Sequence, residues 1–422
     1  MKSHTCSKDI ESLVSRLRKN GPYFEEYTVL LFSFIQKLYA SLQLKKAKSI
    51  VFLSREGYFL KILFDHYQEL RVSPEKRIIS KYFKCSRHAL QGLIPEFCQP
   101  ELFENISLRD YLNILGFEDE EIMQFPLVGL DIDAVIPGRL SCSDEYFVLS
   151  SNDTVQKIIK SRFLENSKAF HIYAKDFFDE DKIYLCDIGY FGTMQDYLQR
   201  ILCKEIEGYY IGRIGNQNVC DPNAEHKHGL IFEYSVNRQT SRLHKILRSN
   251  MLIVEMLLYA PHGSVQHYSL DGKQVKIVEV WKEQEKNLYY TYIEKIQLEM
   301  LKEFSHICQS GILSAGDNTQ EISVSLARMT LRDGLLPSIQ QIQFLIELQN
   351  AMYSNYWKDN RYLRFRVRDA NMNFRHFIKD PEDYVHYIVK APVWFYKHKL
   401  ILFYYPLGLG AYLFYNIRNR LM

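Results

Sequence analysis

The stretch IYLCDIGYFGTMQDYL, residues 183–198, decides the fold class. It starts with residues that favour a β-strand, passes through Asp187 and two glycines, and ends in an amphipathic run that predicts a helix. A second stretch, SIVFLSREGYFLKIL (49–63), has the same order of apolar strand, glycine-bearing loop and helix. Such units are typical of a buried parallel sheet. We therefore predict an α/β fold with a Rossmann-like parallel sheet.

The rest of the chain is organised around these two units. Residues 77–86 and 206–213 read as further strands and 23–43 as an N-terminal helix. The less regular residues 87–175, with helices near 107–115 and 154–170, are interpreted as a hood inserted into the sheet domain. Helical patterns dominate after residue 221, at 246–259, 279–308, 322–331 and 336–357. We predict an α/β domain over residues 1–218 and a mostly helical domain over 219–422.

Composition sets limits on the class of protein. A chain of 422 residues, 47% hydrophobic and 24% charged, is long enough for two folded domains. The net charge of +3 gives no overall indication of nucleic-acid binding. None of the eight cysteines forms a CxxC pair, so no zinc site is indicated and reduced, mostly buried thiols are expected. The N-terminus, MKSHTCSKDIESL, lacks the apolar segment of a signal peptide, and we expect a cytoplasmic protein.

The C-terminal end has a different character. Residues 400–415 carry no charge but include a proline and two glycines, and they are fewer than the ~20 apolar residues that a membrane span needs. Basic residues on both sides favour a segment that lies in the membrane interface. A helical hairpin buried in the C-terminal domain is the alternative.

The two loops suggest a ligand. In an open α/β sheet, ligands bind outside the carboxyl ends of the strands, where both loops would lie. The first loop offers Arg55, which binds phosphate in a planar fork, and Gly57, which permits close backbone approach. The second offers Asp187 for sugar hydroxyls and a helix N-terminus for an anion, although its glycines are equally compatible with an ordinary turn. Together they suit a ligand that carries phosphates and vicinal hydroxyls.

These residues resemble the two binding loops of type I phosphoribosyltransferases. The resemblance implies that Ser54, Arg55 and Gly57 hold the pyrophosphate of phosphoribosyl pyrophosphate. It also implies that the second loop holds the ribose and its 5-phosphate, through Asp187, Gly189, Tyr190, Gly192 and Thr193. Cys186 stands where that family has a first acid, so one acid remains of the usual pair. The sheet would then be of phosphoribosyltransferase type.

Several segments between residues 48 and 270 resemble a narrower bacterial group found with surface-polysaccharide synthesis. They are FLSREGYFLKILFD, YFKCSRHAL, CDIGYFGTMQDYLQ, GYYIG and EMLLYAPHGSVQHY. The resemblance implies transfer of ribose 5-phosphate to a lipid-linked glycan in O-antigen or capsule synthesis, with inversion to a β-ribofuranoside. Mg²⁺ would be held mainly through the donor pyrophosphate. A separate phosphatase would act on the product, because the phosphatase signature of fused relatives is absent from this chain.

Four other residues are candidates with open alternatives. Ser86 and Arg87 follow a predicted strand and either contact phosphate or belong to a loop. Glu255 lies among apolar residues and is either paired or a catalytic base with a raised pKa. His262 is either a turn residue or a substrate ligand.

Two alternatives to this function stay open, a nucleotide-sugar glycosyltransferase and a non-catalytic assembly protein. The tripeptide DID (131–133) fits the metal motif of nucleotide-sugar glycosyltransferases. A non-catalytic membrane-associated assembly protein would use both loops only as turns. The arginines of RYLRFRVRD (361–369) are interpreted as a contact with lipid phosphates rather than with nucleic acid. We expect an enzyme peripheral to the inner face of the cell membrane.

Overall fold

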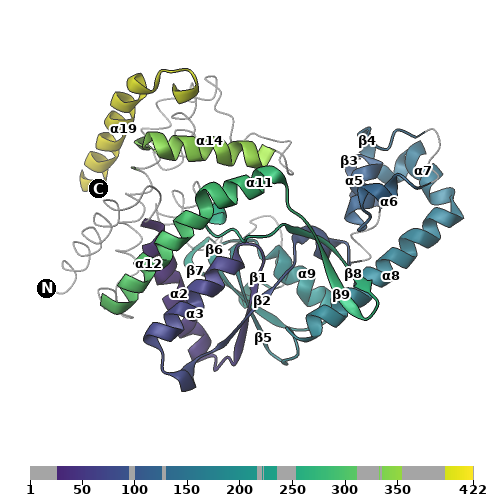
Figure 1. Ribbon diagram of the computed structural model, residues 1–422, viewed down its shortest axis with the longest axis horizontal. Helices are drawn as coiled ribbons and strands as arrows, with labels where there is room; N and C mark the ends of the chain where they lie inside the picture. Colours follow the sequence, from purple (N-terminus) through teal and green to yellow (C-terminus); the bar gives the residue numbers. More distant parts are fainter. Residues whose placement is uncertain are drawn as a thin grey trace.

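The fold is built on one parallel sheet. A computed structural model describes residues 26–94, 100–125, 130–215, 221, 223–234, 253–310, 332, 335–353 and 395–421. In the sheet every neighbouring pair of strands is parallel (Figure 1). Its order is β2 (Ile79–Phe83), β1 (Ser49–Leu53), β5 (Ile183–Tyr190), β6 (Ile206–Ile214) and β7 (Lys227–Tyr234). The predicted α/β class is confirmed, and the parallel sheet is compatible with a Rossmann-like fold.

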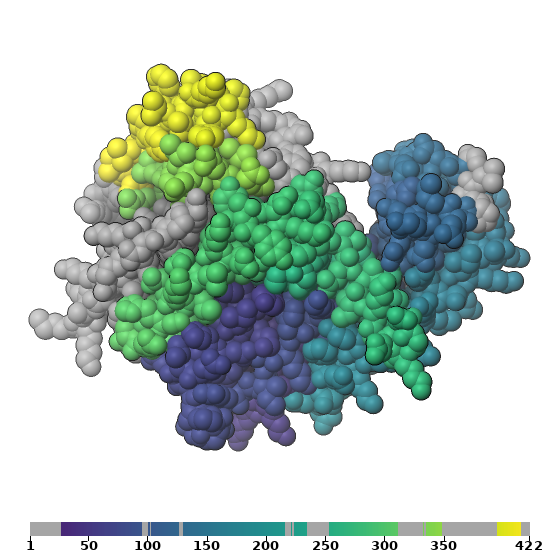
Figure 2. Space-filling view, viewed as in Figure 1, coloured from purple at the N-terminus to yellow at the C-terminus, as the bar shows by residue number. Residues whose placement is uncertain are grey.

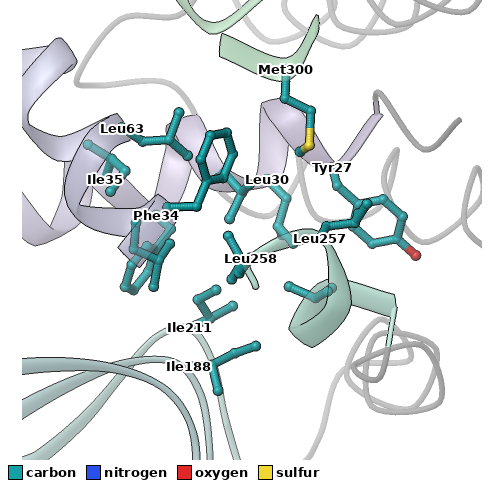
Figure 3. Close-up of a cluster of buried hydrophobic side chains, with 14 of the residues drawn as sticks. Tyr27, Leu30, Phe34, Ile35, Leu63, Ile188, Ile211, Leu257, Leu258 and Met300 are labelled. Carbon is teal, nitrogen blue, oxygen red and sulfur yellow. The ribbon is translucent and has the colours of Figure 1, made fainter. Parts of the chain in front are cut away.

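Both faces of the sheet are buried, because strand residues point alternately to opposite sides. From β1, Ile50 and Phe52 pack in the cluster that includes helices α2 (Glu26–Leu44), α3 (Gly57–Arg71) and α12 (Glu294–Ser310). Val51 and Leu53 pack on the other face, in a cluster that includes α8 (Asp153–Lys175) and α9 (Thr193–Leu202). Figure 3 shows the first of these clusters, where Leu30 and Phe34 of α2 lie near Ile188 and Ile211 of the sheet.

The predicted hood forms a lobe with its own hydrophobic core. It contains β3 (Glu104–Ile106), α5 (Leu108–Ile114), α6 (Asp119–Ile122), β4 (Ile136–Arg139) and α7 (Asp144–Ser151). Figures 1 and 2 show it to one side of the sheet, joined to it by the long helix α8. The helices predicted near 107–115 and 154–170 are confirmed by α5 and α8. The short helix α4 (Arg87–Gln91) instead packs on the sheet through Ala89 and Leu90.

Helices were predicted to dominate after residue 221, but three segments of this part of the chain are strands. β7 completes the sheet, and β8 (Ser264–Asp271) and β9 (Gln274–Val280) form an antiparallel hairpin. β7 was missed because its residues include a lysine, a histidine, a glycine and a glutamate, which interrupt the apolar run expected of a buried strand. The following chain is helical, in α11 (Glu283–Leu288), a π-helical turn (Tyr289–Ile293), α12 and α14 (Ile339–Tyr353).

One hydrophobic cluster contains residues from both sides of the proposed domain boundary, for example Ile211 and Leu257. Residue 218 itself, the predicted helix 322–331 and the arginines at 361–368 lie outside the described residues. The division into two domains therefore stays a prediction.

The C-terminal helix α19 (Ile401–Leu421) is buried on one face only. Tyr404 is 3% exposed, and Gly408 lies so close to Leu335 that a Cβ would come within 2.3 Å of its carbonyl oxygen. On the other face, Leu402 and Phe403 are more than 70% exposed. Figure 2 shows the helix in yellow on the outside of α14. Across the described residues, no helix has the length and hydropathy required to cross a membrane.

Candidate functional site

The two predicted loops meet at one edge of the sheet. β1 and β5 are neighbours, with Phe52 opposite Cys186, so residues 54–57 and residues 187–193 lie at the same end of adjacent strands. The predicted second loop is partly strand, because β5 continues to Tyr190; we keep the name second loop for residues 187–193. The strand order reverses at this pair, because β2 lies on one side of β1 and β5, β6 and β7 lie on the other. In open α/β sheets this reversal point is where ligands bind. The N-termini of α3 and α9 follow the two loops directly.

The second loop requires glycine at two positions. Gly189 has a φ of +134°, and a Cβ there would lie 2.1 Å from the carbonyl oxygen of Gly212 on β6. Gly192 has a φ of +70°, and a Cβ would lie 2.8 Å from the hydroxyl of Tyr210. Gly192 immediately precedes α9, whose first residue is Thr193, and it has no side chain to cap the helix N–H groups. No side chain of the N-cap residue therefore occupies the first N–H groups of α9.

A buried lysine supports this loop. The side chain of Lys227 on β7 is 1% exposed, and its Nζ lies 3.2 Å from the Phe191 carbonyl oxygen. The same Nζ donates to Asp196 Oδ2 at 2.8 Å and lies 3.1 Å from Asp221 Oδ2. Because an unpaired buried charge is costly, these partners hold Lys227 in place, and Lys227 in turn fixes Phe191. Lys227 was not among the site residues predicted from the sequence.

Carboxyl groups gather between the loops. Asp187 is 5% exposed and accepts a hydrogen bond from Ile188 N at 2.7 Å. Its pKa is raised to about 7, first by burial and then by the charge of Glu56, while the charge of Arg87 acts in the opposite direction. Glu56 lies in the first loop, where its Oε2 accepts from Arg55 N at 3.1 Å. Sequence analysis did not single out this acid.

Glu255 belongs to the same group of acids. Burial raises its pKa to about 8, with smaller contributions from the charges of Glu56 and Asp187. A hydrogen bond with Tyr190, at the end of β5, lowers it. The chain at 253–257 is helical, so a helix from the C-terminal half brings Glu255 to the two loops. A carboxyl group with this pKa can exchange a proton near neutral pH.

Arg55, the predicted pyrophosphate ligand, is already paired. Its Nη1 lies 3.2 Å from Glu285 Oε2, and its Nη2 donates to the Tyr259 hydroxyl at 2.7 Å. The side chains of Arg55 and Glu285 are only 16% and 6% exposed. A phosphate bound by Arg55 would have to compete with Glu285 for the guanidinium.

Arg87 is the more accessible cation. It is exposed at the start of α4, and among the residues the structure describes no hydrogen bond or ion pair holds its guanidinium. Its charge nevertheless lowers the pKa values of both Asp187 and Glu255, which places it near these acids. Arg87 is therefore better placed than Arg55 to receive an anion.

The remaining predicted residues make internal contacts. The Ser54 hydroxyl bonds to the backbone of Cys85, and the Ser86 hydroxyl caps α4 and donates to the Val265 carbonyl at 2.6 Å. Gly57 begins α3, where a Cβ would lie 3.0 Å from Phe52. These positions connect β1, α3 and the β8–β9 hairpin around the first loop.

His262 lies close to the first loop but is held on both ring nitrogens. Its Nδ1 is 2.8 Å from the Gly263 carbonyl oxygen, so this nitrogen donates and Nε2 accepts from the Tyr82 hydroxyl at 2.7 Å. Burial lowers the pKa of His262, which favours this neutral form. Of the two alternatives for His262, a turn residue or a substrate ligand, these contacts match the turn residue.

The tripeptide at 131–133 lies in the hood lobe. Asp131 accepts from the backbone of Asp133 and Ala134, and Asp133 pairs with Arg109. Both acids thus serve the folding of the lobe. Within the described ranges, no group of three or more His, Cys, Asp or Glu is arranged to hold a metal ion, so Mg²⁺ binding through a donor stays a prediction.

Comparison with protein-family models and with curated proteins finds no match for this chain.

Proposed function

We propose that the protein is a pentosyltransferase that moves ribose 5-phosphate from phosphoribosyl pyrophosphate to a sugar hydroxyl of a lipid-linked glycan. One observation carries the proposal: residues 54–57 after β1 and residues 187–193 at the end of β5 lie at the same end of adjacent strands, where the strand order reverses. That juxtaposition joins helix N–H groups, arginines and carboxyl groups, which are the partners that a phosphorylated pentose needs. The product would enter polysaccharide synthesis, such as that of O-antigen or capsule.

Each part of the donor has a candidate partner. The 5-phosphate would bind at the N-terminus of α9, after Gly189 and Gly192, and Asp187 would accept hydrogen bonds from ribose hydroxyls. The pyrophosphate would lie at the first loop, near Arg87 and the N-terminus of α3. Mg²⁺, when bound through the donor oxygens, would neutralise part of the pyrophosphate charge, and Glu56 is the nearby carboxylate that could add a protein ligand.

The chemistry follows from this placement. The bond between the anomeric carbon and the pyrophosphate oxygen breaks, and the pyrophosphate leaves with the bonding electrons. The acceptor hydroxyl attacks the opposite face and forms a β-linked glycoside. Glu255 would take the acceptor proton, because its raised pKa makes it a competent base near pH 8. Cationic groups and helix N–H groups stabilise the departing charge.

The C-terminal helix supports a place at the membrane surface. Leu402, Phe403 and Leu407 form part of an exposed apolar face on α19, and Lys397 and Lys399 are exposed immediately before it. An apolar face beside basic residues suits the interface of an anionic bilayer. We place the enzyme at the inner face of the cell membrane, where a lipid-linked acceptor is within reach, with a separate phosphatase acting on its product.

The test begins with the donor. Isothermal calorimetry with phosphoribosyl pyrophosphate and Mg²⁺ should show binding that is lost in Asp187→Asn and retained in Asp179→Asn, which changes an exposed aspartate. Incubation with donor, Mg²⁺ and lipid-linked oligosaccharides should add one ribose phosphate to the acceptor by mass spectrometry. Transfer only from a nucleotide sugar would contradict the proposal. Absence of donor binding would instead favour a non-catalytic assembly protein.

A further inference from the structure

A group of aromatic rings outside the two loops is linked to Arg55 through that residue's partners, Glu285 and Tyr259. Trp281 follows β9, and its ring centroid is 5.7 Å from that of Tyr290 and 6.2 Å from that of Tyr289. Tyr289 is buried, whereas Tyr290 is 50% exposed and Trp281 is partly exposed. Two large aromatic side chains therefore present ring surface to solvent at this position.

This aromatic group is fixed to the site from two directions. Glu285 on α11, one turn after Trp281, accepts a hydrogen bond from Arg55. The amide of Gln297 donates to the Tyr259 carbonyl oxygen at 2.8 Å, and its Oε1 accepts from the Tyr289 hydroxyl at 3.2 Å. The hydroxyl of Tyr259 is the other partner of Arg55. The rings consequently have a defined position relative to the first loop.

The backbone at these rings is unusual. Tyr289–Ile293 form a π-helical turn between α11 and α12. Such turns are rare, and they occur frequently at functional sites. The turn lies at the two tyrosines that contact Trp281, so the irregular backbone and the exposed rings coincide.

We infer that Trp281 and Tyr290 form a subsite that packs against a sugar ring of the acceptor. A pyranose has an apolar face of C–H groups and a rim of hydroxyls, and side chains with an apolar face and a polar edge match it. Lys286 supplies a nearby donor, with its Nζ 5.9 Å from the Trp281 ring centroid. The Trp281 and Tyr290 rings are inclined at 47°, which forms a corner rather than the parallel slot that sandwiches a flat nucleobase.

The assignment of this sugar as the acceptor rests on the proposed function, but sugar binding itself can be tested without a donor. The probes are methyl β-glycosides of glucose, galactose and N-acetylglucosamine, with uridine as the nucleobase competitor. Saturation-transfer NMR should show contact with at least one glycoside. Trp281→Ala and Tyr290→Ala should each weaken that binding at least about fivefold, the lower end of the loss seen when an aromatic ring that stacks on a nucleobase is removed. Tyr290→Phe keeps the ring and should bind as the unaltered protein does.

Phe147→Ala is the matched control, because Phe147 is 70% exposed in the hood lobe. The inference is overturned if no glycoside binds, if uridine binds instead, or if the alanine variants bind like the control. Calorimetry with phosphoribosyl pyrophosphate separates the two proposals. Glycoside binding that depends on Trp281, without donor binding, would refute the transferase and leave the sugar subsite standing. Donor binding without glycoside binding would refute the sugar subsite and leave the transferase proposal standing.

Discussion

Arg55 and Glu285 are 230 positions apart in the sequence, and their side chains meet at a distance of 3.2 Å. Both side chains are largely buried, and Tyr259 completes the contact through a hydrogen bond to the same guanidinium. The pair connects the loop after β1 to helix α11. A residue expected to bind phosphate therefore also holds the C-terminal half of the chain against the sheet.

Loss of Arg55 should destabilise the protein. Arg55→Ala removes the ion-pair partner of the buried Glu285 carboxylate, and breaking a buried pair in this way costs about 3–5 kcal/mol. Urea unfolding measures the change. Arg55→Ala combined with Glu285→Gln should recover part of the loss, because the buried negative charge is then removed together with its cation. Equal stability of Arg55→Ala and the unaltered protein would show that the pair contributes nothing.

Arg87 should affect ligand binding rather than stability. Arg87→Ala should weaken binding of phosphoribosyl pyrophosphate about tenfold or more, because hydrogen bonds to charged groups are worth about 1.5–3 kcal/mol. Its free energy of unfolding should change by less than about 0.5 kcal/mol, as expected of an exposed side chain. Arg139→Ala, in the hood lobe, is the control and should leave donor affinity unchanged. Unchanged affinity in Arg87→Ala would exclude it from the donor site.

Asp187 should lower stability at neutral and higher pH. Its pKa is about 7 in the folded protein against an ordinary 3.8, so folding favours the protonated carboxyl. The contribution of this group to stability is fully present below pH 3.8 and is lost as the pH rises through about 7.

Asp187→Asn removes this ionisation and should stabilise the protein at pH 8 by up to about 4 kcal/mol, with little change at pH 4. Thermal unfolding at the two pH values measures the difference. Asp179→Asn should show no comparable gain, since the pKa of this exposed residue is lowered rather than raised. A smaller gain at pH 8 than at pH 4 would contradict the assignment.

Glu255 should produce a pH dependence of transfer. A general base must be deprotonated, so kcat/KM should rise with pH through about 8. Glu255→Gln should lower kcat by about 10²–10⁴-fold, the usual contribution of general-base catalysis, and should remove this rise. Donor affinity measured by calorimetry should change much less than kcat. If the rise near pH 8 survives in Glu255→Gln, another group is the base.

Helix α19 should bind anionic bilayers through its exposed face. Flotation with vesicles of phosphatidylglycerol and phosphatidylethanolamine should recover the protein in the lipid fraction. The double variant Leu402→Asp with Leu407→Asp should stay in solution, because charged side chains are costly within the apolar part of a bilayer. Leu164→Asp, at a position of α8 that is 59% exposed, should still float. Flotation of the double variant would place the membrane contact elsewhere.

The sequence alone predicted the central strands and the loop after β1, but it ended β5 at Cys186, whereas the strand continues to Tyr190. Apolar runs at 49–54 and 183–186 are typical of buried strands in a layered α/β fold, and parallel strands bring their carboxyl ends to one edge. From this it followed that Arg55 and Asp187 would lie on the same side of the sheet. The positive φ angles at Gly189 and Gly192 explain why those loop positions carry glycine.

Only the tertiary structure decided which polar groups surround these loops. Lys227 and Glu285 carry no local signal, because Asp196 is 31 positions from the first and Arg55 is 230 positions from the second. The same holds for β7, where burial of Lys227 is possible only with Asp196 and Asp221 beside it. The local sequence pattern indicates which apolar residues will be buried. The free energy of burying a charge depends instead on partner groups, and only the folded chain brings those groups close.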